Sequence, residues 1–282
     1  MFYEACRAAD VTPVPYYAPS EIVSDSRPIV EVARFGRGDA RHAIVVTGGS
    51  WEDEGLCAAG IQSSLLHEPL AQRVPPSVAL VLVHAIAPPG FAEPALRLAE
   101  PPTQQWSHRA LAAAETRFTT FMDGGVARTT AAIAGKAWQE ILLRRITDQF
   151  VAGLDRVCLL DIRTGPSQFG NTEILCCADS GTPAHRRAAA LFAEDATDDP
   201  VPAGGAPGDI AKGLLAACDV ANVSAAVLEF GTYSIGSILG VGGDRIFYPE
   251  RGGWRDIVWQ SAARTIWRTA IRLATPAMPS AG

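Results

Sequence analysis

Runs of consecutive apolar residues alternate along the chain with segments whose apolar residues recur at helical spacing. The continuous runs predict buried strands at residues 28–35, 42–47, 78–84, 156–162, 172–177 and 224–232. The helical spacing predicts helices at residues 2–9, 54–67, 105–120, 129–153, 182–193, 209–217 and 254–273. The remaining segments, which include residues 10–27, 92–104 and 195–208, read as coil. This alternation predicts an α/β fold with three layers, α/β/α, built around a mixed, mostly parallel sheet.

Two long helices carry an apolar stripe that we expect to pack on the core. In the helix at 129–153 the stripe comprises Trp138, Ile141, Leu142, Ile146 and Phe150. In the C-terminal helix it comprises Ile257, Val258, Ala262, Ile266, Trp267 and Ile271. No internal repeat or linker marks a boundary, so we expect residues 1–282 to form a single domain.

The strand at 156–162 is the most informative element, because its character changes abruptly at its end. Apolar residues fill its first half, and Asp161, Arg163 and Gly165 follow. Ligands of open α/β sheets bind at the carboxyl ends of such strands. Asp161 and Arg163 therefore stand where chemistry is expected, and a second strand ends in the same way at Glu229 and Gly231.

The composition of the chain argues against nucleic acid and membranes as partners. The 282 residues are 48% hydrophobic and carry a net charge of −6, without the clustered Lys and Arg that nucleic-acid binding needs. No apolar run approaches the roughly 20 residues of a membrane span, and the N-terminus does not read as a secretory signal, so we expect a cytoplasmic protein. The six cysteines lack the CxxC spacing of a zinc ribbon.

Several loop motifs together resemble the zinc carboxypeptidase superfamily, in its succinylglutamate desuccinylase and aspartoacylase-like branch and an uncharacterised bacterial subgroup of it. The subgroup's Gly-Thr-His-Gly-x-Glu-Gly loop and the Ile-Gln of its following helix correspond to Gly49-Ser-Trp-Glu-Asp-Glu-Gly55 and Ile61-Gln62. Its His-Ala-Ile-Asn-Pro-x-Gly-Phe corresponds to His84-Ala-Ile-Ala-Pro-Pro-Gly-Phe91, and its Asp-x-His-Thr-Gly to Asp161-Ile-Arg-Thr-Gly165. The motif Glu-Phe-Gly-Thr-Tyr is intact at residues 229–233. The resemblance covers most of the chain and implies a zinc-carboxypeptidase-like fold.

The chain departs from this family where the family holds zinc. The resemblance places the three metal ligands at Trp51, Glu54 and Arg163, of which only the glutamate can ligate. Catalytic zinc takes three protein ligands, and a guanidinium has no lone pair to give to a metal. The family's Asn-Arg pair for a substrate carboxylate is also missing, because residues 99–106 stand in its place. We therefore expect no metal and no other cofactor.

Glu229 corresponds to the family's general base and acid, and two interpretations of it stay open. It either pairs with Arg163 to satisfy a buried pocket or keeps its role in proton transfer. We expect Glu54 to be a structural partner of Arg163 that lines the substrate pocket, and Asp161 to accept hydrogen bonds. Trp51 either fills vacated volume or forms an aromatic wall for a flat ligand. Tyr233, in the intact motif, is a further substrate-binding candidate.

Other reactive side chains carry less weight. We expect His84 to be a hydrogen-bonded structural residue, and His108 and His185 to be solvated on helix surfaces. Cys57, in the first turn of a helix, is a weak candidate nucleophile. A substitute metal site could draw on His84, Cys57, Asp161 or Asp179, but no pair has a diagnostic spacing.

Three functional hypotheses follow. In the first, the protein is a repurposed, metal-independent enzyme that catalyses a cyclisation, elimination or acyl transfer on a small carboxylate- or amide-bearing molecule. Glu229 is then the general acid and base, and Arg163 takes the place of the metal. In the second, it is a catalytically silent relative that binds a ligand or a partner protein. In the third, it is a zinc amidohydrolase with rebuilt ligands. No oligomeric state is predicted.

Overall fold

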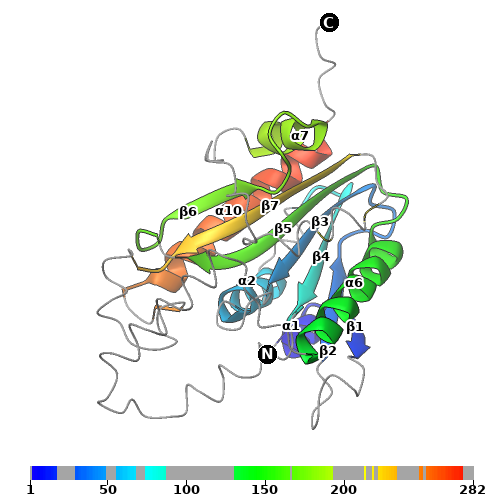
Figure 1. Ribbon diagram of the computed structural model, residues 1–282, viewed down its shortest axis with the longest axis horizontal. Helices are drawn as coiled ribbons and strands as arrows, with labels where there is room; N and C mark the ends of the chain where they lie inside the picture. The colour runs from blue at the N-terminus through cyan, green and yellow to red at the C-terminus, as the bar shows by residue number, and fades with distance from the viewer. Residues whose placement is uncertain are drawn as a thin grey trace, which may run out of the picture.

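The computed structural model describes residues 2–17, 29–48, 55–67, 74–86, 130–165, 167–192, 213, 218, 222–233, 248–249 and 252–275. Its centre is a seven-stranded sheet in the order β1-β2-β4-β3-β5-β7-β6 (Figure 1). The strands are β1 (Val14–Tyr17), β2 (Ile29–Phe35), β3 (His42–Gly48), β4 (Val78–His84), β5 (Arg156–Gly165), β6 (Thr172–Cys176) and β7 (Val223–Gly231). The sheet is mixed: β4, β3, β5 and β7 run parallel, and the outer strands pair antiparallel.

Helices cover both faces of the sheet (Figure 1). On one face, a core forms beneath α1 (Phe2–Ala8), α2 (Gly55–His67), α7 (Pro183–Phe192) and α10 (Trp254–Ala274). On the other face, α6 (Thr130–Phe150) packs its Leu142, Leu143 and Ile146 against the strands. The central strands are buried on both faces, which explains why they read as continuous apolar runs. The predicted three-layer fold with a mixed, mostly parallel sheet is confirmed.

Element bounds agree with the pattern in most of the described chain, with two differences. Residues 14–17, expected to be coil, form the edge strand β1, whose alternating half-buried and exposed residues are too few to stand out as a pattern. Strand β5 continues to Gly165, beyond the expected end at residue 162, because β7 pairs with the three extra residues. The expected helix at 105–120 and the coil at 92–104 and 195–208 lie outside the described residues, as does nearly all of the expected helix at 209–217.

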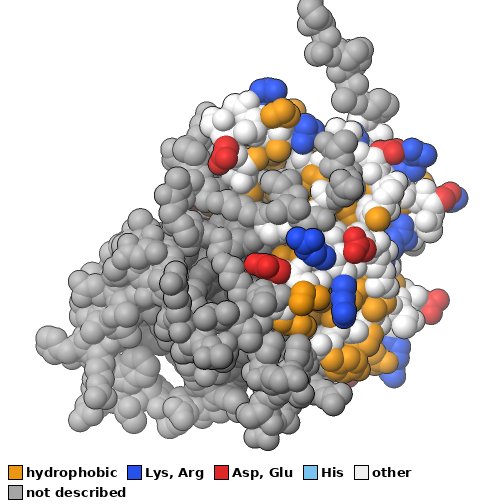
Figure 2. Space-filling view, turned by 45° about the vertical axis from the view of Figure 1, so that its right-hand side comes forward, with side chains coloured by type: hydrophobic (Ala, Val, Ile, Leu, Met, Phe, Trp, Pro, Cys, Tyr) orange, Lys and Arg blue, Asp and Glu red, His pale blue; other side chains and the backbone are white. Residues whose placement is uncertain are grey.

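The apolar stripes were too wide on both long helices. Leu142 and Ile146 are buried on α6, but Ile141 is 53% exposed. On α10, Val258, Ala262 and Ile266 are buried, whereas Ile257 and Ile271 are 42% and 44% exposed. The placement of these three isoleucines in the core was therefore wrong. On the face of the molecule in Figure 2, hydrophobic side chains lie on the surface among interspersed acidic and basic ones.

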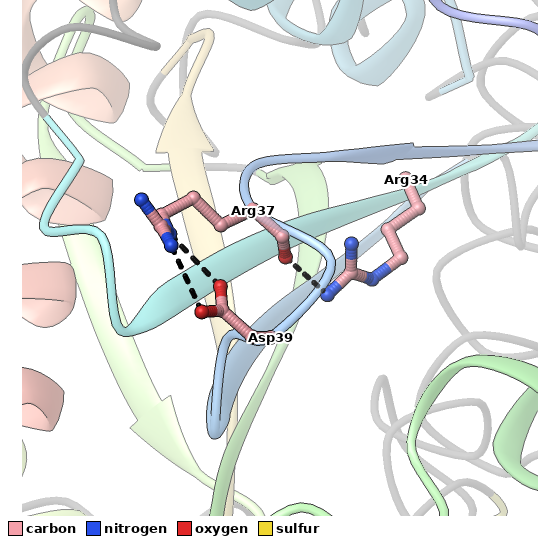
Figure 3. Close-up of polar contacts among 3 residues, drawn as sticks. All are labelled: Arg34, Arg37 and Asp39. Carbon is pink, nitrogen blue, oxygen red and sulfur yellow. Dashed lines mark hydrogen bonds and ion pairs between the residues drawn. The ribbon is translucent and has the colours of Figure 1, made fainter.

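A tight turn joins β2 to β3 (Figure 3). Arg37 forms a two-bonded ion pair with Asp39, its Nε and Nη2 donating to the two carboxylate oxygens at 2.8 and 2.9 Å. Arg34 donates from Nη2 to the carbonyl of Arg37 at 2.8 Å. Gly36 sits in the left-handed region, at φ 113°, with the backbone of Val78 and Ala79 about 3.1 Å from where a Cβ would lie. Both the conformation and the close approach require glycine at this position.

Gln62 attaches α2 to the carboxyl ends of the strands. Its side-chain nitrogen donates to the carbonyls of Val46 and Val83, on β3 and β4, at 3.1 and 3.0 Å. The residue is 1% exposed. A buried amide that joins two strands to a helix fixes the edge of the sheet where a ligand would bind. None of the described helices combines the length and apolar character that crossing a bilayer needs.

Candidate functional site

Five polar side chains form a row across the sheet at the carboxyl ends of β3, β5 and β7. The register places Thr47 beside Asp161, Arg163 beside Glu229, and Glu229 beside Glu173 of β6. Asp161 and Arg163 are two residues apart on one strand, so they share a face. Leu159 and Val227 lie on the same face of the sheet, nearer the middle of β5 and β7, and they belong to the core that α6 covers. We call Thr47, Asp161, Arg163, Glu229 and Glu173 the polar row.

Arg163 and Asp161 form a buried ion pair at the centre of the polar row. The Nε of Arg163 donates to Asp161 Oδ2 at 2.9 Å, and its Nη2 lies 2.8 Å from the same oxygen, outside hydrogen-bonding geometry. Asp161 Oδ1 accepts from the Thr47 hydroxyl at 2.8 Å. The Arg163 side chain is 1% exposed, and neither Nη1 nor Nη2 has a hydrogen-bond partner among the described residues. Within the described part of the chain, the guanidinium is thus held from one side by Asp161 alone.

Asp161 fulfils its expected role as a hydrogen-bond acceptor, and it also takes the place of Glu229 as the ion-pair partner of Arg163. Asp161 and Arg163 are two residues apart on β5, so their side chains lie on the same face of the sheet. The short side chain of Asp161 contacts the Nε of Arg163. Among the described residues Glu229 has no ion pair with Arg163, although the positive charge of Arg163 still acts on it.

Glu229 is half-buried and lies over the end of β5. A Cβ added to Gly165 would stand 2.1 Å from Glu229 Oε1 and 2.3 Å from its Cδ, so the carboxyl group occupies the space above that glycine. Burial raises the pKa of Glu229, the nearby Glu173 raises it further, and Arg163 opposes the rise. A carboxyl group that retains its proton above the ordinary range suits general acid and base chemistry.

Glu173 is a member of the polar row that the sequence reasoning missed. It lies directly opposite Glu229 on the antiparallel neighbour β6 and accepts a hydrogen bond from Asn171 Nδ2 at 2.9 Å. Its strand was predicted, but the pairing partner and register of an antiparallel edge strand are not encoded in any local motif. A polar residue on a strand next to the intact Glu-Phe-Gly-Thr-Tyr motif was the only available signal.

Backbone contacts fix the ends of β5 and β7 around Glu229. The carbonyl of Gly165 accepts from both the backbone N–H and the hydroxyl of Thr232, at 3.1 and 3.2 Å. The buried Trp254 donates from Nε1 to the carbonyl of Gly231 at 2.8 Å. A Cβ on Gly231 would lie 2.1 Å from the carbonyl oxygen of Gln168, so the loop after β5 packs directly on β7. Tyr233 follows this segment and is half-buried.

His84, at the end of β4, is the structural histidine that was predicted. Its Nδ1 lies 2.9 Å from the side-chain oxygen of Gln62, and its ring stacks on Phe2 with 4.2 Å between centroids. Burial lowers the pKa of His84 to about 4, so the ring is neutral at physiological pH. Its contacts serve the packing of α1 and α2 on the sheet.

The remaining predicted residues fall outside this cluster. Trp51, Glu54 and His108 lie outside the described residues. Cys57 is buried on α2, Asp179 is exposed, and His185 is half-buried on α7. The structure therefore brings together Asp161, Arg163 and Glu229, with Tyr233 close by in the chain.

The described residues do not fit a zinc ion in the polar row. The guanidinium of Arg163 is buried, positively charged and bonded to Asp161, and it has no lone pair to give to a metal ion. Within the described part of the chain, no group of three or more His, Cys, Asp or Glu residues is arranged to hold a metal ion. We therefore derive no chemical step through a metal.

Comparisons with known proteins agree with the fold. Residues 1–99 and 134–265 match the family DUF2817, described as a protein of unknown function. No curated protein matches the sequence. A metallo-carboxypeptidase from Burkholderia cenocepacia is similar over 97% of this chain and 69% of its own, with a TM-score of 0.53 and 11% identity.

A succinylglutamate desuccinylase from Chromobacterium violaceum is similar over 95% of this chain and 73% of its own, with 12% identity and a TM-score of 0.45. The similarity to the metallo-carboxypeptidase, at 11% identity, concerns the fold alone and leaves the reaction open. The chain belongs to the DUF2817 family, and its α/β fold is that of the zinc carboxypeptidases.

Proposed function

We propose that the polar row is the centre of a metal-independent enzyme site for a small carboxylate- or amide-bearing molecule. One observation carries this proposal: the buried Arg163 is fixed by Asp161 on one side, while its Nη nitrogens have no hydrogen-bond partner among the described residues. A buried guanidinium with free N–H groups is a ready donor to a carboxylate or to a polarised carbonyl. Such groups rarely stay unsatisfied without a functional reason.

Glu229 supplies proton transfer in this proposal. It is the in-register neighbour of Arg163, and its raised pKa lets it release or accept a proton nearer to neutral pH than an ordinary glutamate. Arg163 holds the substrate oxygen and stabilises negative charge that develops on it. Glu229 takes a proton from one substrate atom and delivers it to the group that leaves, as a cyclisation, elimination or acyl transfer requires.

Arg163 cannot generate hydroxide from water, because that chemistry depends on ligation of the water by a metal. The proposal therefore excludes from this site the hydrolysis that zinc performs in the superfamily. Trp51, Glu54 and Tyr233 remain proposed substrate contacts.

Conversion of a panel of small carboxylates and amides, followed by NMR, tests the proposal. We expect Glu229→Gln to lower turnover at least about 100-fold while the substrate still binds, because only the proton transfer is removed. Glu140→Gln, on an exposed part of α6, is the matched control and keeps full activity. Undiminished turnover in Glu229→Gln would remove this residue from the mechanism.

Metal analysis of the purified protein tests the second half of the proposal. We expect turnover and thermal stability to be unchanged by chelator. Stoichiometric zinc whose removal lowers stability would favour instead a zinc amidohydrolase with ligands rebuilt from elsewhere in the chain.

A catalytically silent binding protein is the second candidate, and one observation favours it. Asp161 already neutralises Arg163, as in a pair kept for structure alone. Ligands that bind at Arg163 but are never converted, in the wild type as in Glu229→Gln, would establish this alternative.

A further inference from the structure

The polar row carries more negative charge than its cation can balance. Asp161 and Arg163 neutralise each other across a contact of 2.8 Å. Glu229 and Glu173 remain, directly opposite each other on β7 and β6 and without an ion pair among the described residues. Like charges at directly opposed positions of antiparallel strands destabilise a sheet. The arrangement is therefore costly unless a further cation joins it.

The charges follow a fixed order from strand to strand. Arg163 of β5 is the in-register neighbour of Glu229 of β7, which in turn faces Glu173 of β6. Neighbouring strands lie about 4.8 Å apart. Arg163 is therefore one strand spacing from Glu229 and two from Glu173. A ligand that fits this order carries a negative group at Arg163 and a positive group a few bonds away.

Two independent observations support a ligand with both charges. The first is the 1% exposed guanidinium of Arg163, whose Nη1 and Nη2 have no hydrogen-bond partner among the described residues and can donate to an acceptor. The second is the uncompensated pair of carboxyl groups beside it, which calls for a cation. Asn171 donates to only one oxygen of Glu173, and Arg163 acts on Glu229 through its charge but forms its ion pair with Asp161, so one positive charge stands against three carboxyl groups of the polar row.

We infer that the ligand of the polar row is a small aminocarboxylate, whose carboxylate is held by Arg163 and whose ammonium group lies between Glu229 and Glu173. This inference rests on the proposed function, because it keeps Arg163 as the carboxylate anchor, and it assigns a substrate-selecting role to Glu173. The ammonium group relieves the repulsion between the two carboxylates and brings an exchangeable proton to Glu229. A plain carboxylic acid satisfies Arg163 but leaves the acidic pair unbalanced.

Matched pairs of small molecules, titrated by NMR, test the inference. Glycine, β-alanine and γ-aminobutyrate are compared with acetate, propionate and butyrate, which have the same carbon chains without the amine. We expect one aminocarboxylate to bind at least about tenfold more tightly than its matched acid, a difference of about 1.4 kcal/mol. The chain length that binds best reports the distance between the two charged ends of the site.

Glu173→Gln is the decisive variant, because it removes one negative charge and keeps the shape and the hydrogen bond from Asn171. We expect it to abolish most of the preference for the amine while leaving the affinity for the matched acid unchanged or higher. Glu140→Gln, at an exposed position of α6, is the control and keeps the preference.

Each outcome separates this inference from the proposed function. Equal affinity for acids and aminocarboxylates, unaffected by Glu173→Gln, overturns the inference and leaves Arg163 as an anchor. Binding of methylamine or ethylamine alone, without any binding of carboxylates, overturns the anchor role of Arg163 and with it the aminocarboxylate. Binding of none of these probes at millimolar concentration also overturns the inference, whereas turnover of an amide in the earlier panel would still support the proposed function.

Discussion

An Arg–Asp ion pair lies near each end of strand β5, and the two pairs differ in burial and in hydrogen-bond geometry. At the amino ends of the strands, Arg41 donates from Nε and Nη2 to both oxygens of Asp155, at 2.5 and 2.7 Å, and the side chains are 72% and 40% exposed. At the carboxyl ends, Arg163 and Asp161 meet through a single carboxylate oxygen and are 1% and 0% exposed.

The two ion pairs differ in burial and in the completeness of their hydrogen bonding. The pair of Arg41 has ideal two-bonded geometry in solvent, where water screens it and would replace it readily. The pair of Arg163 is less complete, yet it is buried, where an unsatisfied N–H group is costly. The difference is what the proposed function draws on, because the buried guanidinium keeps two nitrogens without a hydrogen-bond partner among the described residues.

The largest expected effect is the loss of the buried pair. Arg163→Met leaves the carboxylate of Asp161 buried without its cation, and we expect a loss of about 3–5 kcal/mol in the free energy of unfolding. Urea denaturation followed by circular dichroism measures this loss. If the variant is too unstable to purify, the double variant below still provides the test.

The double variant Arg163→Met, Asp161→Asn removes both charges and keeps an acceptor for the Thr47 hydroxyl. We expect it to recover most of the stability that Arg163→Met loses, because the cost arises from an unpaired charge rather than from a missing contact. A double variant as unstable as the single one would contradict the assignment of a charge pair.

Much of the fold follows from the sequence because buried parallel strands have an unmistakable pattern. Residues 78–83 and 157–160 are continuous apolar runs, which lack the alternation of a strand covered on one face and are too short for a typical helix. The edge strand β1 gave no such signal, since only one of its faces is covered. Helix stripes predicted too much burial at Ile141, Ile257 and Ile271, because spacing fixes a helix face but not the width of the surface that covers it.

The sequence predicted those residues of the candidate site that belong to a recognisable motif at the end of a strand. Asp161, Arg163 and Glu229 stand at the ends of two strands that the sequence already marked, and the register joins them. The pairing of Arg163 with Asp161 rather than Glu229 depends on side-chain geometry, which spacing does not give. Glu173 depends on the register of β6 against β7, a non-local property that a single strand cannot reveal.

Substitution of Glu229 should change stability less than Arg163→Met does, and in the opposite direction. Burial and Glu173 raise the pKa of this carboxyl group, so the folded state binds its proton more tightly than the unfolded chain does. Ionisation therefore destabilises the folded state at neutral pH, and the penalty disappears as the pH falls through the raised pKa toward the ordinary value of 4.5. We expect Glu229→Gln to stabilise the protein by roughly 0.5–1 kcal/mol at neutral pH.

The stability of Glu229→Gln and wild type, compared by urea denaturation across the acidic range, checks the sign. The gain should shrink as the pH falls and vanish below 4.5, where wild-type Glu229 is itself protonated. Glu173→Gln should give a gain in the same direction, because either substitution relieves the like-charge pair. A loss of stability in Glu229→Gln at neutral pH would show that its negative charge is compensated by a cation.

The smallest effect is expected at the exposed pair. Arg41→Met removes both hydrogen bonds to Asp155, but water solvates the freed carboxylate at once, so no buried charge is created. We expect the folding equilibrium to change by less than about fivefold, and the difference from wild type to fade in high salt, where exposed charges are screened. Urea denaturation of Arg41→Met at low and high salt, beside that of Arg163→Met, makes the comparison direct. A loss as large as that of Arg163→Met, unaffected by salt, would mean that the two ends of β5 are alike and that burial is not what sets the pair of Arg163 apart.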